Sequence, residues 1–143
     1  MTPTEIAPGL SVAPQLAPSD IAGLAAQGVK TIINNRPDGE EPGQVPAAEV
    51  RAEAERHGIA YVHIPLTMGT MTRADIAAVE RAVAESPGPT VAHCRSGTRC
   101  YVLWAAGQVL AGKGDAAALF AEGAAKGFDL RALPEVVARL KQD

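Results

Sequence analysis

A cysteine and an arginine five positions apart carry the clearest chemistry in this sequence. The segment Cys94-Arg95-Ser96-Gly97-Thr98-Arg99 follows a short apolar stretch and His93, and it precedes an apolar segment that begins at Tyr101. A strand, a tight loop and a helix start, in this order, direct backbone N–H groups and the positive end of a helix dipole to one point, which favours anion binding. The same field lowers the pKa of a thiol, so Cys94 is predicted to be a thiolate nucleophile.

The other residues of this segment have the types that an anion-binding loop needs. Arg99 carries a planar guanidinium that can hold a tetrahedral oxyanion through two N–H groups. Gly97 permits the tight curvature that turns N–H groups inward. The hydroxyls of Ser96 and Thr98 are further donors, and Arg95 is expected at the rim, facing either solvent or substrate. Residues 94–99 are called the anion loop below.

The rest of the chain alternates short apolar runs with helical patterns. Strands are predicted at 29–34, 59–64 and 90–93, with a further short strand at 10–12; helices are predicted from about 19, 46, 72 and 100, and at 115–124 and 133–140. This alternation indicates an α/β fold with a mainly parallel central sheet of four to five strands, flanked by helices on both faces. A length of 143 residues is that of a single domain, 1–143, with one core.

Ligands of parallel sheets bind at the carboxyl ends of the strands, so the segments that follow the strands are expected to form one crevice. Asn35 and Arg36, which begin the polar loop 35–44, are predicted to form walls of this crevice. His93 is predicted to brace the anion loop through hydrogen bonds to the backbone rather than to accept a proton from Cys94. Residues 35–44 are called the acidic loop below.

Composition limits the partners and the location. The net charge is −3 and no basic cluster is present, so neither nucleic acid nor an anionic membrane is an expected partner. The N-terminal segment does not resemble a signal peptide, the run 101–107 is too short to span a bilayer, and both cysteines lie in one segment, which favours the reducing cytoplasm. Two cysteines and three scattered histidines do not make a metal site, and no cofactor is expected.

The segment His93-Cys94-x-x-Gly97 resembles the signature loop of cysteine-based tyrosine and dual-specificity phosphatases, which has five residues between Cys and Arg. This chain has four, and the run from Cys94 to Arg99 resembles the active loop of rhodanese sulfurtransferases. The segments Gly28–Gly39 and Tyr61–Pro65 are similar to the dual-specificity phosphatase scaffold. Together, over about residues 8–112, the chain resembles the bacterial family called beta-lactamase hydrolase-like protein, phosphatase-like domain, whose members are described both as phosphatases and as sulfurtransferases.

The resemblance implies a phosphatase fold and a hydrolase that cleaves phosphate monoesters through a phospho-cysteine on Cys94. It also implies a general acid, for which Asp38 is the candidate because the loop 66–71 has no carboxylate. Asp38 has an alternative role in turn formation, and Asp75 is better explained as a helix cap. Cys100 stands where the family usually has Ser; it could act as a resolving thiol or be a small buried residue.

Two other functions remain open from the sequence. One is a rhodanese-type sulfurtransferase that carries a persulfide on Cys94, which needs no general acid. The other is a binding module for anions or phosphoproteins with weak activity. The expected partner is accordingly a small anionic substrate, a phosphoprotein or a sulfane-sulfur donor.

Overall fold

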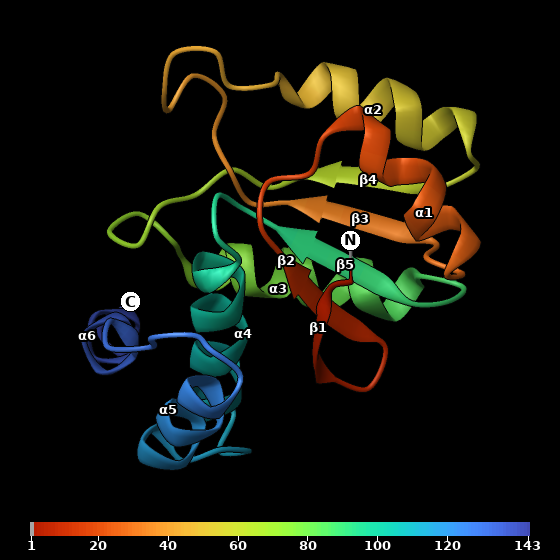
Figure 1. Cartoon of the computed structure of the whole chain (residues 1–143). Coiled ribbons are helices and arrows are strands. Elements are labelled where there is room, and N and C mark those ends of the chain that lie inside the picture. The colour runs from red at the N-terminus through yellow and green to blue at the C-terminus, as the bar shows by residue number, and fades with distance from the viewer. Residues whose placement is uncertain (1) are drawn as a thin grey trace.

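The computed structural model describes residues 2–143, and its strands form one sheet in the order β1-β2-β5-β3-β4 (Figure 1). The strands are β1 (Thr4–Ala7), β2 (Leu10–Ala13), β3 (Thr31–Asn34), β4 (Ala60–His63) and β5 (Thr90–His93). β1 and β2 form an antiparallel hairpin, whereas β2, β5, β3 and β4 are parallel. β5 therefore lies at the centre of the sheet, and every residue of β3 and β5 is buried, as expected where helices cover both faces.

Two layers of helices cover the sheet. The helical elements are the 3₁₀ turn η1 (Pro18–Asp20), α1 (Ile21–Ala26), α2 (Ala47–Arg56), α3 (Arg73–Glu85), α4 (Thr98–Leu110), α5 (Ala116–Ala125) and α6 (Leu133–Leu140). In Figure 1, α1 and α2 lie on one face, α3 and α4 lie on the other, and α5 and α6 pack against α4. Each layer has its own apolar cluster, the smaller around Ile21, Leu24 and Val50 and the larger around the α4 side chains.

The α/β architecture and the mainly parallel sheet confirm the fold predicted from the sequence. The predicted helix cap of Asp75 is confirmed, because Thr72 Oγ1 accepts from the Asp75 N–H and the Asp75 carboxylate accepts from the Thr72 N–H. β1 was not predicted, since the prolines around it obscure its alternation. α4 begins two residues earlier than predicted, so that Arg99 lies in its first turn rather than before it.

The parallel register brings four connections to one edge of the sheet. His93 at the end of β5 is level with Ala13 of β2 and with Asn34 of β3, and Asn34 is level with His63 of β4. The segments that follow these residues contain the anion loop, the acidic loop and residues 64–72. The predicted crevice at the carboxyl ends of the strands is therefore where the candidate site lies.

Candidate active site

The anion loop is a tight turn between the central strand and α4. Gly97 is the N-cap of α4 and has a φ of 96°, a left-handed conformation that glycine adopts without steric cost. A side chain there would also collide with its surroundings, because an added Cβ would lie 3.0 Å from the Phe128 ring and 3.3 Å from the Ala13 carbonyl oxygen. The loop is held from outside by the Gln15 N–H, which donates to the Arg95 carbonyl at 3.0 Å.

The Cys94 sulfur lies inside this turn. It accepts a hydrogen bond from the Gly97 N–H at 3.1 Å, and Cys94 is fully buried. The pKa of Cys94 is lowered to about 5, first because the Cys100 thiol donates to its sulfur and then because the N–H groups of Cys100, Gly97 and Ser96 also do, against the opposing effect of burial. A pKa this low favours the thiolate form of Cys94 at neutral pH.

Cys100 is the matching donor on the first turns of α4. Burial and the hydrogen bond to Cys94 raise the pKa of Cys100 well above its usual range, so it stays a thiol. Both cysteines are free and buried. The position where the resemblance implied Ser thus carries a thiol beside Cys94.

The Arg99 guanidinium is paired with a carboxylate that the sequence analysis did not single out. Its Nη1 and Nη2 donate to the two oxygens of Glu40 at 2.7 and 2.8 Å, and Nη1 also donates to the Leu66 carbonyl at 3.0 Å. The pKa of Glu40 is lowered to about 2, first by the hydrogen bond from Arg99 and then by that from Arg36. The signal that could have found Glu40 is the Glu40-Glu41 pair, placed in a long polar loop after a buried strand.

Arg36 holds the acidic loop in place from inside. Its side chain is buried, and it donates to Glu40 at 2.8 Å, to Glu41 at 3.0 Å and to the Gln15 amide oxygen at 3.0 Å. Arg95, by contrast, is exposed over 68% of its side chain and approaches Glu41 at 3.5 Å. Arg36 therefore lies in the crevice as predicted, although its guanidinium contacts the protein's own carboxylates.

Asn35 links the ends of β5 and β4, and the side chain of His93, predicted to brace the anion loop, makes one long contact to the loop backbone. The Asn35 N–H donates to the His93 carbonyl at 2.8 Å, and the Asn35 side-chain amide donates to the Ile64 carbonyl at 2.9 Å. His93 Nδ1 lies 3.4 Å from the Cys94 carbonyl oxygen. Burial lowers the pKa of His93 to about 4, so this imidazole is neutral at physiological pH.

Asp38, the predicted general acid, lies at the N-terminus of α2. Its Oδ1 accepts from the Ala47 N–H at 2.8 Å, which satisfies one of the free donors at the helix start. This contact places Asp38 on the α2 side of the crevice. The Tyr61 phenol is nearby, and its pKa is raised by burial and, to a smaller extent, by the charge of Asp38. The Ser96 hydroxyl donates to the Thr98 hydroxyl at 3.0 Å, and Ser96 is exposed.

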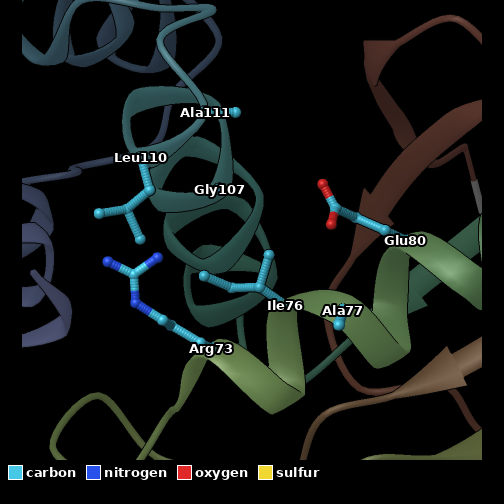
Figure 2. Close-up of a pocket in the computed structure, with 7 residues that line it drawn as sticks. All are labelled: Arg73, Ile76, Ala77, Glu80, Gly107, Leu110 and Ala111. Atoms are coloured by element: carbon cyan, nitrogen blue, oxygen red, sulfur yellow. The ribbon is translucent and has the colours of Figure 1, made fainter. Parts of the chain in front are cut away.

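A well-formed cavity lies elsewhere, between α3 and α4 (Figure 2). It has a volume of about 220 Å³, and Arg73 and Glu80 flank it on either side of Ile76. Leu110 on its wall is at the opposite end of α4 from the anion loop, about 18 Å along the helix axis at 1.5 Å per residue. The residues that line this cavity include no thiol, hydroxyl or imidazole, and the candidate active site is the anion loop with the segments around it.

The fold and the loop together define the class. The architecture is that of the protein-tyrosine and dual-specificity phosphatases: similar solved structures include a candidate phosphatase from Neisseria meningitidis Z2491, with 30% sequence identity, a TM-score of 0.81 and coverage of 92% of both chains. Pseudomonas aeruginosa TpbA, solved in complex with pTyr, has 20% identity, a TM-score of 0.66 and coverage of 90% of this chain and 76% of its own. At that identity the second likeness shows the fold alone.

The chain belongs to the family described as beta-lactamase hydrolase-like protein, phosphatase-like domain, whose model matches residues 4–111. A beta-lactamase hydrolase-like protein of Agrobacterium fabrum is 42% identical over 121 residues, which is 85% of this chain and 28% of the relative. The chain thus spans little more than a quarter of the length of the curated relatives that it matches. The family match runs from β1 to the end of α4 and therefore includes every loop of the site.

Membrane-crossing helices and metal-binding clusters are both absent from residues 2–143. No helix there has the length and apolar character that crossing a membrane requires. The same part of the chain holds no group of three or more His, Cys, Asp or Glu side chains arranged to bind a metal ion.

Proposed function

We propose that this chain is a cysteine-dependent phosphatase that hydrolyses phosphate monoesters through a phospho-cysteine on Cys94. The observation that carries the proposal is the environment of the Cys94 sulfur. A thiolate with a pKa of about 5 lies at the N-terminus of a helix, among N–H donors and near Arg99. Membership in a phosphatase-like family supports a hydrolase, and the geometry supports Cys94 as its nucleophile.

The proposed reaction has two steps. In the first, the phosphoryl group of the substrate binds over the anion loop, Cys94 attacks the phosphorus, and the leaving oxygen takes a proton from Asp38. In the second, water attacks the phospho-cysteine and gives its proton back to Asp38, while the Cys94 thiolate leaves with inorganic phosphate as the other product. The Gly97 N–H and the Cys100 thiol, which stabilise the thiolate in the free protein, stabilise it again as the leaving group.

Asp38 remains the proposed general acid, although Glu40 is the carboxylate that contacts Arg99. Glu40 is ionised well below neutral pH by Arg99 and Arg36, so it has no proton to donate. Asp38 forms its hydrogen bond to the Ala47 N–H through Oδ1, and no hydrogen bond to Oδ2 occurs among residues 2–143. Oδ2 is therefore the atom proposed to carry the proton.

One observation favours sulfur transfer as a second candidate function. The anion loop has four residues between Cys94 and Arg99, as in rhodaneses, and Cys94 is fully buried, which suits a small donor. In this reaction the Cys94 thiolate attacks the sulfane sulfur of thiosulfate, sulfite leaves, and Cys94 becomes a persulfide that a thiol acceptor then discharges.

The test is turnover of an aryl phosphate, of the same ester type as pTyr, together with intact mass spectrometry. The unaltered protein is expected to hydrolyse the ester, and Cys94→Ser is expected to lower the rate at least about 10³-fold because a hydroxyl is not ionised at neutral pH. Asp38→Asn is expected to lower kcat by about 10²-fold while retaining the hydrogen bond to Ala47.

Three results would contradict the proposal. Turnover retained in Cys94→Ser would exclude covalent catalysis. A persulfide formed with thiosulfate, in the absence of phosphatase turnover, would establish the second function instead. Phosphate binding with neither reaction would leave an anion-binding module. Unchanged kcat in Asp38→Asn would exclude only the assignment of the acid.

A further inference from the structure

The five N–H groups of Arg99 are not equally used. Nη1 has two N–H groups, and both are bonded, one to Glu40 and one to the Leu66 carbonyl. Nη2 donates one N–H to the other oxygen of Glu40. Within residues 2–143, no hydrogen bond uses the N–H of Nε or the second N–H of Nη2, and these two donors lie on one edge of the planar guanidinium. This edge is the pair of donors that binds two oxygens of a tetrahedral oxyanion side-on.

Glu40 is itself held by a second arginine. Glu40 Oε1 accepts from Arg36 Nε at 2.8 Å as well as from Arg99 Nη2 at 2.8 Å. Arg36 follows β3, and its side chain has only 3% of its surface exposed, so it has little freedom to move. The three side chains form a relay from the sheet edge to the anion loop, in the order Arg36, Glu40, Arg99.

The other charged side chains beside the relay form no ion pair with Arg99, so Glu40 is its carboxylate partner. Glu41 pairs with Arg36 at 3.0 Å and with Arg95 at 3.5 Å, and it makes no ion pair with Arg99. The relay and its neighbours therefore contain three arginines and two carboxylates, and the Cys94 thiolate beside Arg99 is the third negative charge. The Glu40 amide N–H donates to the Gln44 side chain at 2.9 Å, which fixes the backbone that carries the carboxylate.

We propose that Glu40 is a positioning residue for the reaction of the preceding section: anchored by Arg36, it turns the guanidinium of Arg99 so that the edge bearing Nε and Nη2 is presented to the substrate phosphoryl group. This inference rests on the proposed function for its substrate, and on the hydrogen bonds of Arg99 for its geometry. A mobile arginine side chain loses conformational entropy when it binds a phosphoryl group, which weakens the binding. An arginine already fixed by Glu40 binds the group without that cost.

The opposite role for Glu40 would be competition, in which its carboxylate occupies Arg99 and must be displaced by the substrate. The two roles predict opposite effects when the contact is weakened, provided that the charge is kept. A neutral variant does not separate them, because the loss of a negative charge beside the site strengthens anion binding in either case. Glu40→Asp keeps the charge but is one methylene shorter, so it cannot reach both Arg99 and Arg36.

The first measurement is binding of inorganic phosphate by calorimetry, which needs no turnover. Glu40→Asp is expected to weaken phosphate binding about 10-fold, with Glu41→Asp as the matched control that leaves the affinity within twofold. Arg36→Lys, which keeps the charge but not the planar fork, is expected to give the same loss as Glu40→Asp, and the double variant no further loss. Urea unfolding of each variant identifies any that has lost its fold.

The second measurement separates positioning from a merely structural role. With an aryl phosphate, Glu40→Asp is expected to lower kcat by more than it raises KM, because the equatorial oxygens of the transferred group engage Arg99 most closely in the transition state. Tighter or unchanged phosphate binding in a folded Glu40→Asp would overturn the inference, as would equal losses in Glu41→Asp or no phosphate binding by the unaltered protein. Weakened phosphate binding in a protein that hydrolyses no ester would uphold the positioning role and refute the phosphatase proposal.

Discussion

The anion loop and the acidic loop follow neighbouring strands and meet at Arg99, yet they are built in different ways. The anion loop is closed by short-range contacts, such as the Gly97 N–H to the Cys94 sulfur and the Thr98 N–H to the Ser96 hydroxyl. The acidic loop is held by charged side chains, and its contact with Arg99 spans 59 positions of the sequence. The nucleophile therefore depends on local backbone geometry, whereas the orientation of the arginine depends on tertiary pairing.

We expect the largest effect from Arg99→Lys, because Arg99 is the residue at which the two loops meet. Lysine keeps the charge but loses the planar fork, so it can satisfy neither the two oxygens of Glu40 nor a side-on oxyanion. We expect kcat/KM for an aryl phosphate to fall about 10²-fold. Arg95→Lys is the control, since Arg95 is largely exposed, and its effect is expected to stay below about fivefold. An unchanged kcat/KM in Arg99→Lys would mean that positive charge alone, and not the orientation of the Arg99 guanidinium, carries the affinity.

The same difference explains which parts of the site could be predicted from the sequence. The lowered pKa of Cys94, the left-handed Gly97 and the helix after them follow from residue types and spacings within a few positions of the sequence. The alternation of strands and helices likewise gave the parallel sheet, because hydrophobic periodicity is a local signal.

Pairing across the crevice could not be predicted in this way. Asp38, Glu40 and Glu41 are all carboxylates within four positions, and sequence alone gives no reason to prefer one as the partner of Arg99. The choice is made by the α2 N-terminus, which binds Asp38, and by the buried Arg36, which directs Glu40 toward Arg99. Both depend on where distant backbone segments lie in the fold.

Alanine substitution of one glycine in each loop shows how much each loop contributes to the free energy of unfolding. Gly97 and Gly43 both have a left-handed φ, of 96° and 76°, but an added Cβ at Gly43 would have nothing within 4 Å. Gly43→Ala should therefore cost only the backbone strain, about 1 kcal/mol in the free energy of unfolding, and Gly97→Ala about 2 kcal/mol because of the contacts with Phe128 and Ala13. Urea unfolding measures both, and phosphate binding should be lost only in Gly97→Ala. If Gly43→Ala costs as much, the anion loop is not the more tightly packed of the two.

The smallest expected effect is confined to the anion loop and concerns the pH dependence of Cys94. The rate at which a small alkylating reagent modifies Cys94 follows the thiolate, so in the unaltered protein it should be lost as the pH falls through about 5. Cys100→Ala removes the thiol that does most to lower the pKa of Cys94, so the loss of reactivity should move to higher pH. Cys100→Ser keeps a hydrogen-bond donor and should restore the low pH midpoint of alkylation. Because a hydroxyl is a stronger donor than a thiol, this variant should also speed the departure of the Cys94 thiolate from a phospho-cysteine. Neither variant touches the pair of Glu40 and Arg99, so phosphate binding should stay unchanged at any pH where Cys94 is a thiolate in all three proteins. An unshifted midpoint in Cys100→Ala would assign the low pKa of Cys94 to the helix N–H groups alone.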